Sequence, residues 1–155
     1  MYFQMKLLHD FIDETRKNRK RRYKRIQIGT ISDEAQKRIE NICGRKILEI
    51  DIDNSGIIHA IKKAEHNLQP DDLLNVVEVI NTATDISISS KKHKSNDVLV
   101  FKKDIDGEIT FLAEIHEKNG YLLIFNAWRA KKARRDATAQ RPSANVQNES
   151  PRTDA

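Results

Sequence analysis

The sequence predicts an α+β fold in which N-terminal helices pack on a C-terminal antiparallel β-meander of about four strands. Apolar residues follow the 3.6-residue helical period in roughly the first half of the chain. Beyond it, four segments are rich in β-branched and aromatic residues. The dipeptides Asp106-Gly107 and Asn119-Gly120, both favoured in hairpin turns, separate the last three of them. Helices followed by a meander pack as two layers.

The chain of 155 residues is long enough for one hydrophobic core. Residues 1–4 are typical of a tag remnant, and residues 5–25 are expected to form a basic helical arm or linker. The α+β domain is expected over residues 26–132. Residues 133–155 are polar and predicted to be disordered. The single cysteine, Cys43, excludes an intramolecular disulfide and leaves too few thiols for structural zinc, so it is predicted to be a core residue.

Two helices are predicted before residue 45. The first, within residues 5–25, has a short apolar stripe that gives way to cations. Ser32 can cap the second helix and Gly44 can stop it. The apolar positions are Leu7, Leu8, Phe11 and Ile12 in the first helix, and Ala35, Ile39, Ile42 and Cys43 in the second.

A short strand at residues 47–52 is predicted to follow, and then two more helices. Asn54 or Ser55 can cap the third helix, and Pro70 opens the fourth. Their apolar stripes are Ile57, Ala60, Ile61, Ala64 and Leu68 in the third, and Leu73, Val76, Val77 and Ile80 in the fourth.

The predicted strands of the meander are residues 86–90, 97–103, 108–116 and 121–128. If both hairpin turns have two residues, the register sets Lys102 opposite Phe111, Phe111 opposite Trp128, and Ala113 opposite both Val100 and Asn126. One face then carries a core of Val98, Val100, Ile115, Leu122 and Ile124, with Lys102, Asn126 and Trp128 gathered around Ala113. Lysine, amide and indole suit phosphate, hydrogen bonding and base stacking. The alternative is that Trp128 belongs to the core and Lys102 extends along it to solvent.

Positive charge is concentrated in two segments. Eight of the ten residues 16–25 and five of the seven residues 129–135 are Lys or Arg, and without these thirteen the net charge of +5 would be −8. Such clusters bind phosphate backbones by releasing counterions, which favours a polyanion, most of all RNA, as partner. The alternative is that each run is a solvated surface. No apolar run reaches the roughly 18–20 residues of a membrane span.

One face of the third predicted helix carries His59, Lys62, Lys63 and His66, which are spaced i, i+3, i+4 and i+7. Imidazoles exchange protons near neutral pH, and lysines hold phosphate, so this set suits phosphodiester chemistry without a metal. The alternative is a solvated face with incidental histidines. No glycine-rich phosphate loop, metal-ligand spacing or nucleophile elbow is present, so neither a cofactor nor a metal is expected.

Four segments of the sequence carry a resemblance to known proteins: the run from Ser55 to Lys63, the Gln69-Pro70-Asp71-Asp72 helix start, the run from Val98 to Lys103 and the Asp106-Gly107 turn. Together they resemble the phage-associated nucleases of the barnase, EndoU, colicin and RelE group. The resemblance spans roughly residues 25–132. It implies a metal-independent ribonuclease toxin, often attached to a phage structural protein or a delivered bacterial toxin. Such a toxin acts in the cytoplasm of the target cell and is neutralised by an immunity protein.

Carried onto this chain, the resemblance places the family's helical histidine on His59 and its sheet lysine on Lys102 or Lys103. The small polar residue of the last strand falls on Asn126, where the family more often has Ser or Thr. Many relatives carry a second histidine five positions after the first, and here that position is Ala64. Either His66 takes over its role, or this chain is an inactive form.

The sequence therefore predicts an RNA endonuclease, with tRNA as one candidate substrate, in which the 2′-hydroxyl attacks the adjacent phosphate and leaves a 2′,3′-cyclic phosphate. The expected catalytic set is His59, Lys63, His66, Lys102 and Asn126, and the expected RNA contacts are Lys62, Lys103, Trp128 and Arg129. His59 is the expected acid or base, and Lys63 and Lys102 would stabilise the phosphate. The alternatives are a non-catalytic nucleic-acid-binding module of a phage structural protein and a pure protein-interaction domain.

Overall fold

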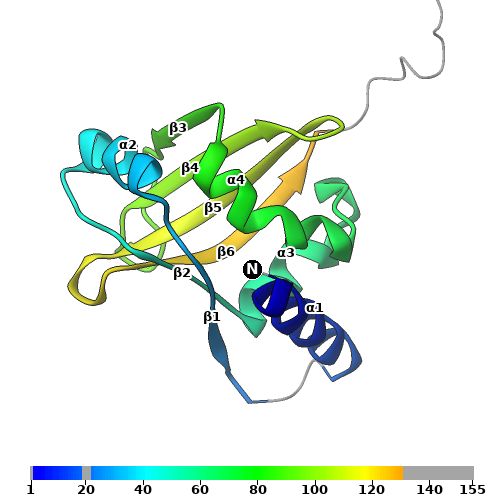
Figure 1. Ribbon diagram of the computed structural model, residues 1–155. Coiled ribbons are helices and arrows are strands. Elements are labelled where there is room, and N and C mark those ends of the chain that lie inside the picture. The colour runs from blue at the N-terminus through cyan, green and yellow to red at the C-terminus, as the bar shows by residue number, and fades with distance from the viewer. Residues whose placement is uncertain (1, 19–21, 131–155) are drawn as a thin grey trace, which may run out of the picture.

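The computed structural model describes residues 2–18 and 22–130, with side chains from Met5 onward, and has an α+β fold. Six strands form one mixed sheet in the order β1-β2-β6-β5-β4-β3, with helices α2 and α4 over one face (Figure 1). The strands are β1 (Arg25–Thr30), β2 (Glu49–Asp53), β3 (Asp85–Ile88), β4 (Val98–Asp104), β5 (Glu108–His116) and β6 (Tyr121–Arg129). The helices are α1 (Tyr2–Lys17), α2 (Asp33–Cys43), α3 (Asn54–Lys62) and α4 (Val76–Thr82), and three 3₁₀ turns are η1 (Ala64–His66), η2 (Pro70–Asn75) and η3 (Glu117–Asn119).

The four C-terminal strands form the predicted antiparallel meander, but the sheet is larger than predicted. Strand β2 adds to β6 in parallel, and β1, which was not predicted, adds to β2 in antiparallel orientation. Two parallel strands are connected by a long crossover and not by a tight turn, so no turn motif in the sequence predicts their pairing. The periodicity of the apolar residues therefore predicted the correct fold class, α+β, but only part of the sheet.

Helix α2 forms as predicted. The Ser32 hydroxyl accepts a hydrogen bond from the Ala35 backbone N–H (3.2 Å), and Gly44 ends the helix with a φ of 73°, in the left-handed region that glycine adopts readily. Ala35 and Ile39 are buried, whereas Ile42 is exposed and Cys43 half-buried.

Helix α3 is shorter than predicted and begins one residue earlier. Its cap is Asp53, which accepts from the Gly56 N–H at 2.6 Å, and it ends at Lys62 because Lys63 adopts an extended conformation. Ile57 and Ala60 are buried as predicted. Ala64, expected on the apolar stripe, is exposed at the start of η1, although Leu68 is buried.

The predicted fourth helix is a 3₁₀ turn, η2, that continues into α4. Gln69 and Asp72 form a reciprocal capping box, and the Asp72 carboxylate accepts from the Gln69 N–H at 2.8 Å. Leu73, Val76 and Ile80 are buried as predicted, and Val77 is half-buried.

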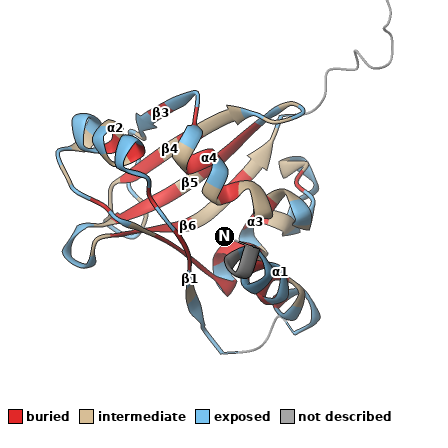
Figure 2. Ribbon diagram, viewed as in Figure 1, coloured by how far each residue is buried: buried red, intermediate tan, exposed pale blue. Residues whose placement is uncertain are grey.

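Helix α1 is part of the folded body and not a separate arm. Leu8, Phe11 and Ile12 are 2–4% exposed and belong to the main core, and the helix packs on α3, β1 and η2 (Figure 2). Leu7, predicted on the same stripe, is 40% exposed. The predicted boundary at residue 26 falls inside β1, and the predicted tag remnant lies partly within the α1 range.

The predicted hairpin register is wrong because neither turn has two residues. Asp104 pairs with Glu108, so residues 105–107 form a three-residue loop, and His116 pairs with Tyr121 across a four-residue turn. A one-residue shift changes which face a side chain occupies. Lys102 consequently pairs with Thr110 instead of Phe111, Phe111 pairs with Ala127 instead of Trp128, and Leu112 takes the place predicted for Ala113, opposite Val100 and Asn126.

Strand β6 also contains a bulge, in which Phe125 is the extra residue between the pairs Leu112–Asn126 and Ala113–Ile124. Ala113, Ile115, Leu122 and Ile124 belong to the core under the helices. Val98 and Val100, predicted to share that core, lie on the opposite face, because Val98 pairs with Glu114 and Val100 with Leu112.

The second basic segment beyond Ala130 and the predicted polar tail lie outside the described residues. Within the described ranges, none of the helices has the length and apolar character needed to cross a bilayer.

Replacing Phe11 with alanine tests whether α1 belongs to the core. Loss of a fully buried aromatic side chain is expected to lower the free energy of unfolding by about 3–5 kcal/mol. Leu7→Ala, on the exposed side of the same helix, should change it far less. Urea unfolding measures both variants, and equal small effects would show that α1 does not contribute to the core.

Candidate nucleic-acid site

The sheet face opposite α2 and α4 carries polar and aromatic side chains, and we call it the polar face. Directly paired residues in antiparallel strands share a face, so the β4–β5–β6 register defines its members. They include Lys102, Thr110, Glu114, His116, Asn126 and Trp128. The register correction thus leaves Lys102, Asn126 and Trp128 on one face, as predicted, with Thr110 and Leu112 between them in place of Ala113.

Two of the predicted histidines meet beside the end of β6. The ring centroids of His59 and His66 are 6.2 Å apart, and those of His66 and Trp128 are 6.3 Å apart. His66 Nδ1 donates to the Ala60 carbonyl oxygen at 3.0 Å, which turns its ring back toward α3. His59 belongs to the last turn of α3 and His66 to η1, so the two come together without the continuous helix predicted.

The pKa of His59 is lowered from its ordinary value. Burial is the largest cause, because desolvation disfavours the imidazolium form, and the charges of His66, Lys63, Lys62 and His93 add to it. A lowered pKa favours the neutral form of the ring, in which imidazole accepts a proton, and His59 itself is an exposed residue.

A second group of side chains lies farther along the polar face, centred on Glu114. This carboxylate is 2% exposed, and each of its oxygens accepts from a histidine: Oε1 from His116 Nε2 at 2.8 Å and Oε2 from His93 Nδ1. The His93 ring stacks on Phe125, with centroids 3.9 Å apart and planes inclined by 11°. The His116 ring stacks on Tyr121 at 4.6 Å. Hydrogen bonds and stacking thus fix both imidazoles.

The polar network continues onto β1 and β2. Arg25 lies over the Tyr121 ring at 4.4 Å, donates to the Tyr121 hydroxyl, and forms an ion pair with Asp51 at 3.2 Å. Burial raises the pKa of Asp51, and the Arg25 guanidinium partly offsets this. Aromatic and charged groups therefore line the polar face from β1 to β6.

The predicted lysines are placed apart from one another. Lys63 lines, with Arg16, Asn67 and other residues, a hollow of about 350 Å³ beside η1 and η2, and Lys62 is exposed. Lys102 is half-buried on the polar face. Lys103 points to the helical side, where its ammonium donates to the Thr82 hydroxyl and lies 3.5 Å from Glu78. Only Lys102 of the two sheet lysines shares a face with Trp128.

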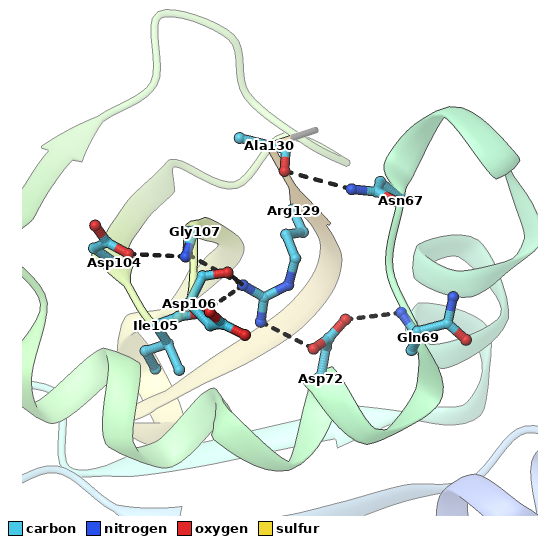
Figure 3. Close-up of polar contacts among 9 residues, drawn as sticks. All are labelled: Asn67, Gln69, Asp72, Asp104, Ile105, Asp106, Gly107, Arg129 and Ala130. Carbon is cyan, nitrogen blue, oxygen red and sulfur yellow. Dashed lines mark hydrogen bonds and ion pairs between the residues drawn. The ribbon is translucent and has the colours of Figure 1, made fainter. Parts of the chain in front are cut away.

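The predicted RNA contact Arg129 is engaged within the fold (Figure 3). Its guanidinium donates to the carbonyl oxygens of Ile105, Asp106 and Gly107 at 2.5, 3.2 and 3.1 Å, and forms an ion pair with Asp72 at 2.9 Å. Its side chain is 12% exposed. Arg129 thus ties the β4–β5 loop to η2. Asn126, in turn, accepts from the Ala127 N–H at 2.9 Å.

The sequence reasoning missed His93, Glu114 and His116. A weak signal was present, because Glu114 and His116 are two residues apart in a predicted strand and must share one face. His93 lies among lysines in the loop between β3 and β4, and no sequence period could have connected it with Glu114.

Among the described residues no cluster of three or more His, Cys, Asp or Glu side chains is arranged to hold a metal ion. The chain matches no protein-family model, no curated protein and no solved structure at a significant level. The fold and site together define an α+β protein with a histidine-rich polar sheet face.

Arg129→Ala is expected to destabilise the fold by about 3 kcal/mol, because it leaves Asp72 and three loop carbonyls without their shared donor. Lys103→Ala is the matched control, since its partner Glu78 is 59% exposed and such pairs contribute under about 1 kcal/mol. Thermal unfolding followed by circular dichroism compares them. Equal effects of the two substitutions would contradict the assigned role of Arg129.

The lowered pKa of His59 predicts a pH dependence of stability. The unfolded chain takes up a proton at His59 near the ordinary pKa of about 6.5, whereas the folded chain does so only at lower pH. This residue should therefore reduce the free energy of unfolding as pH falls through the interval between the two values, and have no effect above it. NMR titration of the His59 ring against His9, an exposed histidine of α1, measures the shift directly. A His59 value at or above 6.5 would refute it.

Proposed function

We propose that the chain is a metal-independent endoribonuclease that cleaves RNA by attack of the 2′-hydroxyl on the adjacent phosphate, leaving a 2′,3′-cyclic phosphate. The observation that carries this proposal is the proximity of the His59, His66 and Trp128 rings at one end of the polar face, with successive centroids 6.2 and 6.3 Å apart. The lowered pKa of His59 is consistent with it. In-line attack needs a proton acceptor, a proton donor and groups that hold the phosphate and a base.

His59 is the proposed proton acceptor for the 2′-hydroxyl. A lowered pKa keeps the imidazole unprotonated, so the lone pair is available at neutral pH. His66, one ring away, is the nearest candidate for the second proton carrier. Trp128 provides a flat apolar surface on which a base can stack.

Positive charge near His59 supports the same assignment. Lys62 and Lys63 are close enough for their charges to lower its pKa, and they would offset charge that develops on the phosphate. Lys102 and Asn126 lie on the polar face with Trp128, where they could contact phosphate and ribose. RNA, with tRNA among the candidates, is the proposed substrate, and an immunity protein that covers this face is the proposed natural inhibitor.

A non-catalytic RNA-binding module is the second candidate. It is favoured by a hollow of about 760 Å³ whose lining combines the cations Lys17, Arg22 and Lys24 with the aromatic Tyr23, together with Glu14 and Asn18. Binding there would need none of the histidines.

Incubation of tRNA and total RNA in EDTA with the unaltered protein and with His59→Ala tests the proposal. We expect discrete fragments with cyclic-phosphate ends from the unaltered protein and at least a 10²-fold loss of rate in His59→Ala. DNA should remain intact because it lacks the 2′-hydroxyl. Tight, salt-sensitive RNA binding without cleavage would favour the binding module, and cleavage of DNA that requires a metal would rule out this mechanism.

Ala64→His tests whether the chain is a disarmed form. Residue 64 is exposed at the start of η1, so histidine fits there without disturbing the core. If cleavage appears only in this variant, the unaltered chain is inactive and position 64 supplies the missing group. No gain in rate over an active unaltered protein would leave His66 or another histidine as the second proton carrier.

A further inference from the structure

The Glu114 group is a buried charge with a specific arrangement of partners. A carboxylate that is 98% removed from solvent is costly unless its oxygens are hydrogen-bonded, and here a different histidine binds each oxygen. Carboxylate–imidazole pairs hold one tautomer and stabilise the imidazolium form. Glu114 therefore keeps a proton on Nδ1 of His93 and leaves Nε2 of that ring free for another partner.

The position of His93 is set by the bulge in β6. Phe125, the extra residue of the bulge, stacks on the His93 ring. On the other side of the same bulge, α3 lies against the β6 backbone: a Cβ on Gly56 would fall 2.6 Å from the Ile124 carbonyl oxygen and 3.2 Å from Phe125 Cα. The His93 ring and α3 therefore both lie against Phe125, and His59 is three residues, or about one helical turn, beyond Gly56 in α3.

The charge of His93 also lowers the pKa of His59, by less than the charges of His66, Lys63 and Lys62. His93 is also accessible, with 35% of its side chain exposed. His116 binds the same carboxylate, but its ring stacks on Tyr121, which Arg25 contacts as well. Within residues 2–18 and 22–130, which the structure describes, His66 hydrogen-bonds the Ala60 backbone carbonyl and no carboxylate.

We propose that His93, oriented by Glu114, and not His66, is the general acid that protonates the leaving 5′-oxygen of RNA. This inference rests on the proposed ribonuclease function. The proton of the 2′-hydroxyl passes to His59 as the bond from the 2′-oxygen to phosphorus forms. The bond from phosphorus to the 5′-oxygen breaks as His93 Nε2 gives its proton to that oxygen, and Nδ1 remains hydrogen-bonded to Glu114. The products are a cyclic phosphate and a 5′-hydroxyl, and exchange with water resets both histidines.

A leaving group that needs no proton tests this assignment. The substrates are the dinucleotide uridylyl-adenosine and its analogue with sulfur in place of the bridging 5′-oxygen, because a thiolate departs without protonation. His93→Gln should slow cleavage of the oxygen substrate by about 10²- to 10⁴-fold and leave cleavage of the sulfur substrate close to that of the unaltered protein. His59→Ala should slow cleavage of both, since the proton acceptor is still needed.

Comparison of Glu114→Gln with His116→Gln tests whether Glu114 orients His93 or only stabilises the fold. Glu114 is a positioning residue, so its variant should raise the ratio of sulfur to oxygen rates as His93→Gln does, whereas His116→Gln should leave that ratio unchanged. Circular dichroism checks that each variant is folded. If Glu114→Gln does not fold, His93→Gln alone decides the assignment, because its ring is partly exposed.

Two outcomes distinguish failure of this inference from failure of the proposed function. If the unaltered protein cleaves RNA and His93→Gln slows both substrates equally or neither, His93 is not the general acid and the ribonuclease proposal stands. If the unaltered protein cleaves neither substrate, both are overturned. NMR adds a readout besides activity, since uridine 3′-monophosphate should shift the His93 ring resonances and leave those of His9 unchanged.

Discussion

The parallel pairing of β2 with β6 is the constraint on which the rest of the structure depends. Because α3 begins directly after β2 and is capped by its last residue, Asp53, the pairing fixes where α3 lies against β6. Gly56 permits the close approach, since a side chain there would meet the β6 backbone. His59 consequently lies near the C-terminal end of β6, beside His66 and Trp128. A β2 strand placed elsewhere would leave the histidines of α3 and η1 without that partner.

The two faces of the sheet bury different kinds of side chain. Strands β4 and β5 are largely buried (Figure 2). Their side chains on the face under α2 and α4 are aliphatic and aromatic, and include Phe101 and Phe111. The polar face buries Glu114 and Asp51, and each retains charged or hydrogen-bonding partners, from His93 and His116 in one case and from Arg25 in the other. A stable sheet needs no such groups. The carboxylate of Glu114 holds the two imidazoles in fixed orientations, and this is the geometry on which the proposed role of His93 depends.

Local signals predicted the elements well and their arrangement poorly. Ser32 and Gly44 fix the ends of α2 through their own backbone preferences, which a sequence displays directly. The loop at residues 105–107 depends instead on Arg129, which is more than twenty residues away and binds all three carbonyls of the loop. A dipeptide such as Asp106-Gly107 is compatible with either a two- or a three-residue loop. The distant guanidinium favours the longer one, and the register follows from it.

The same distinction explains what could be predicted of the site. His59 and His66 were predicted to be neighbours because they lie only seven residues apart in the sequence. Their rings are close even though α3 ends at Lys62, between the two residues. Lys102, Asn126 and Trp128 stayed together because the net register shift is one residue on both sides of β5 at that end of the sheet. The second turn shifts the register by two residues, and the bulge in β6 removes one of them. His93 comes from a loop, Glu114 from the middle of a strand, and Phe125 from a bulge, so only the tertiary structure unites them. The periodicity of the sequence therefore could not reveal groups that long-range strand pairing brings together. In this protein they include Glu114, the carboxylate of the polar face that accepts a hydrogen bond at each oxygen.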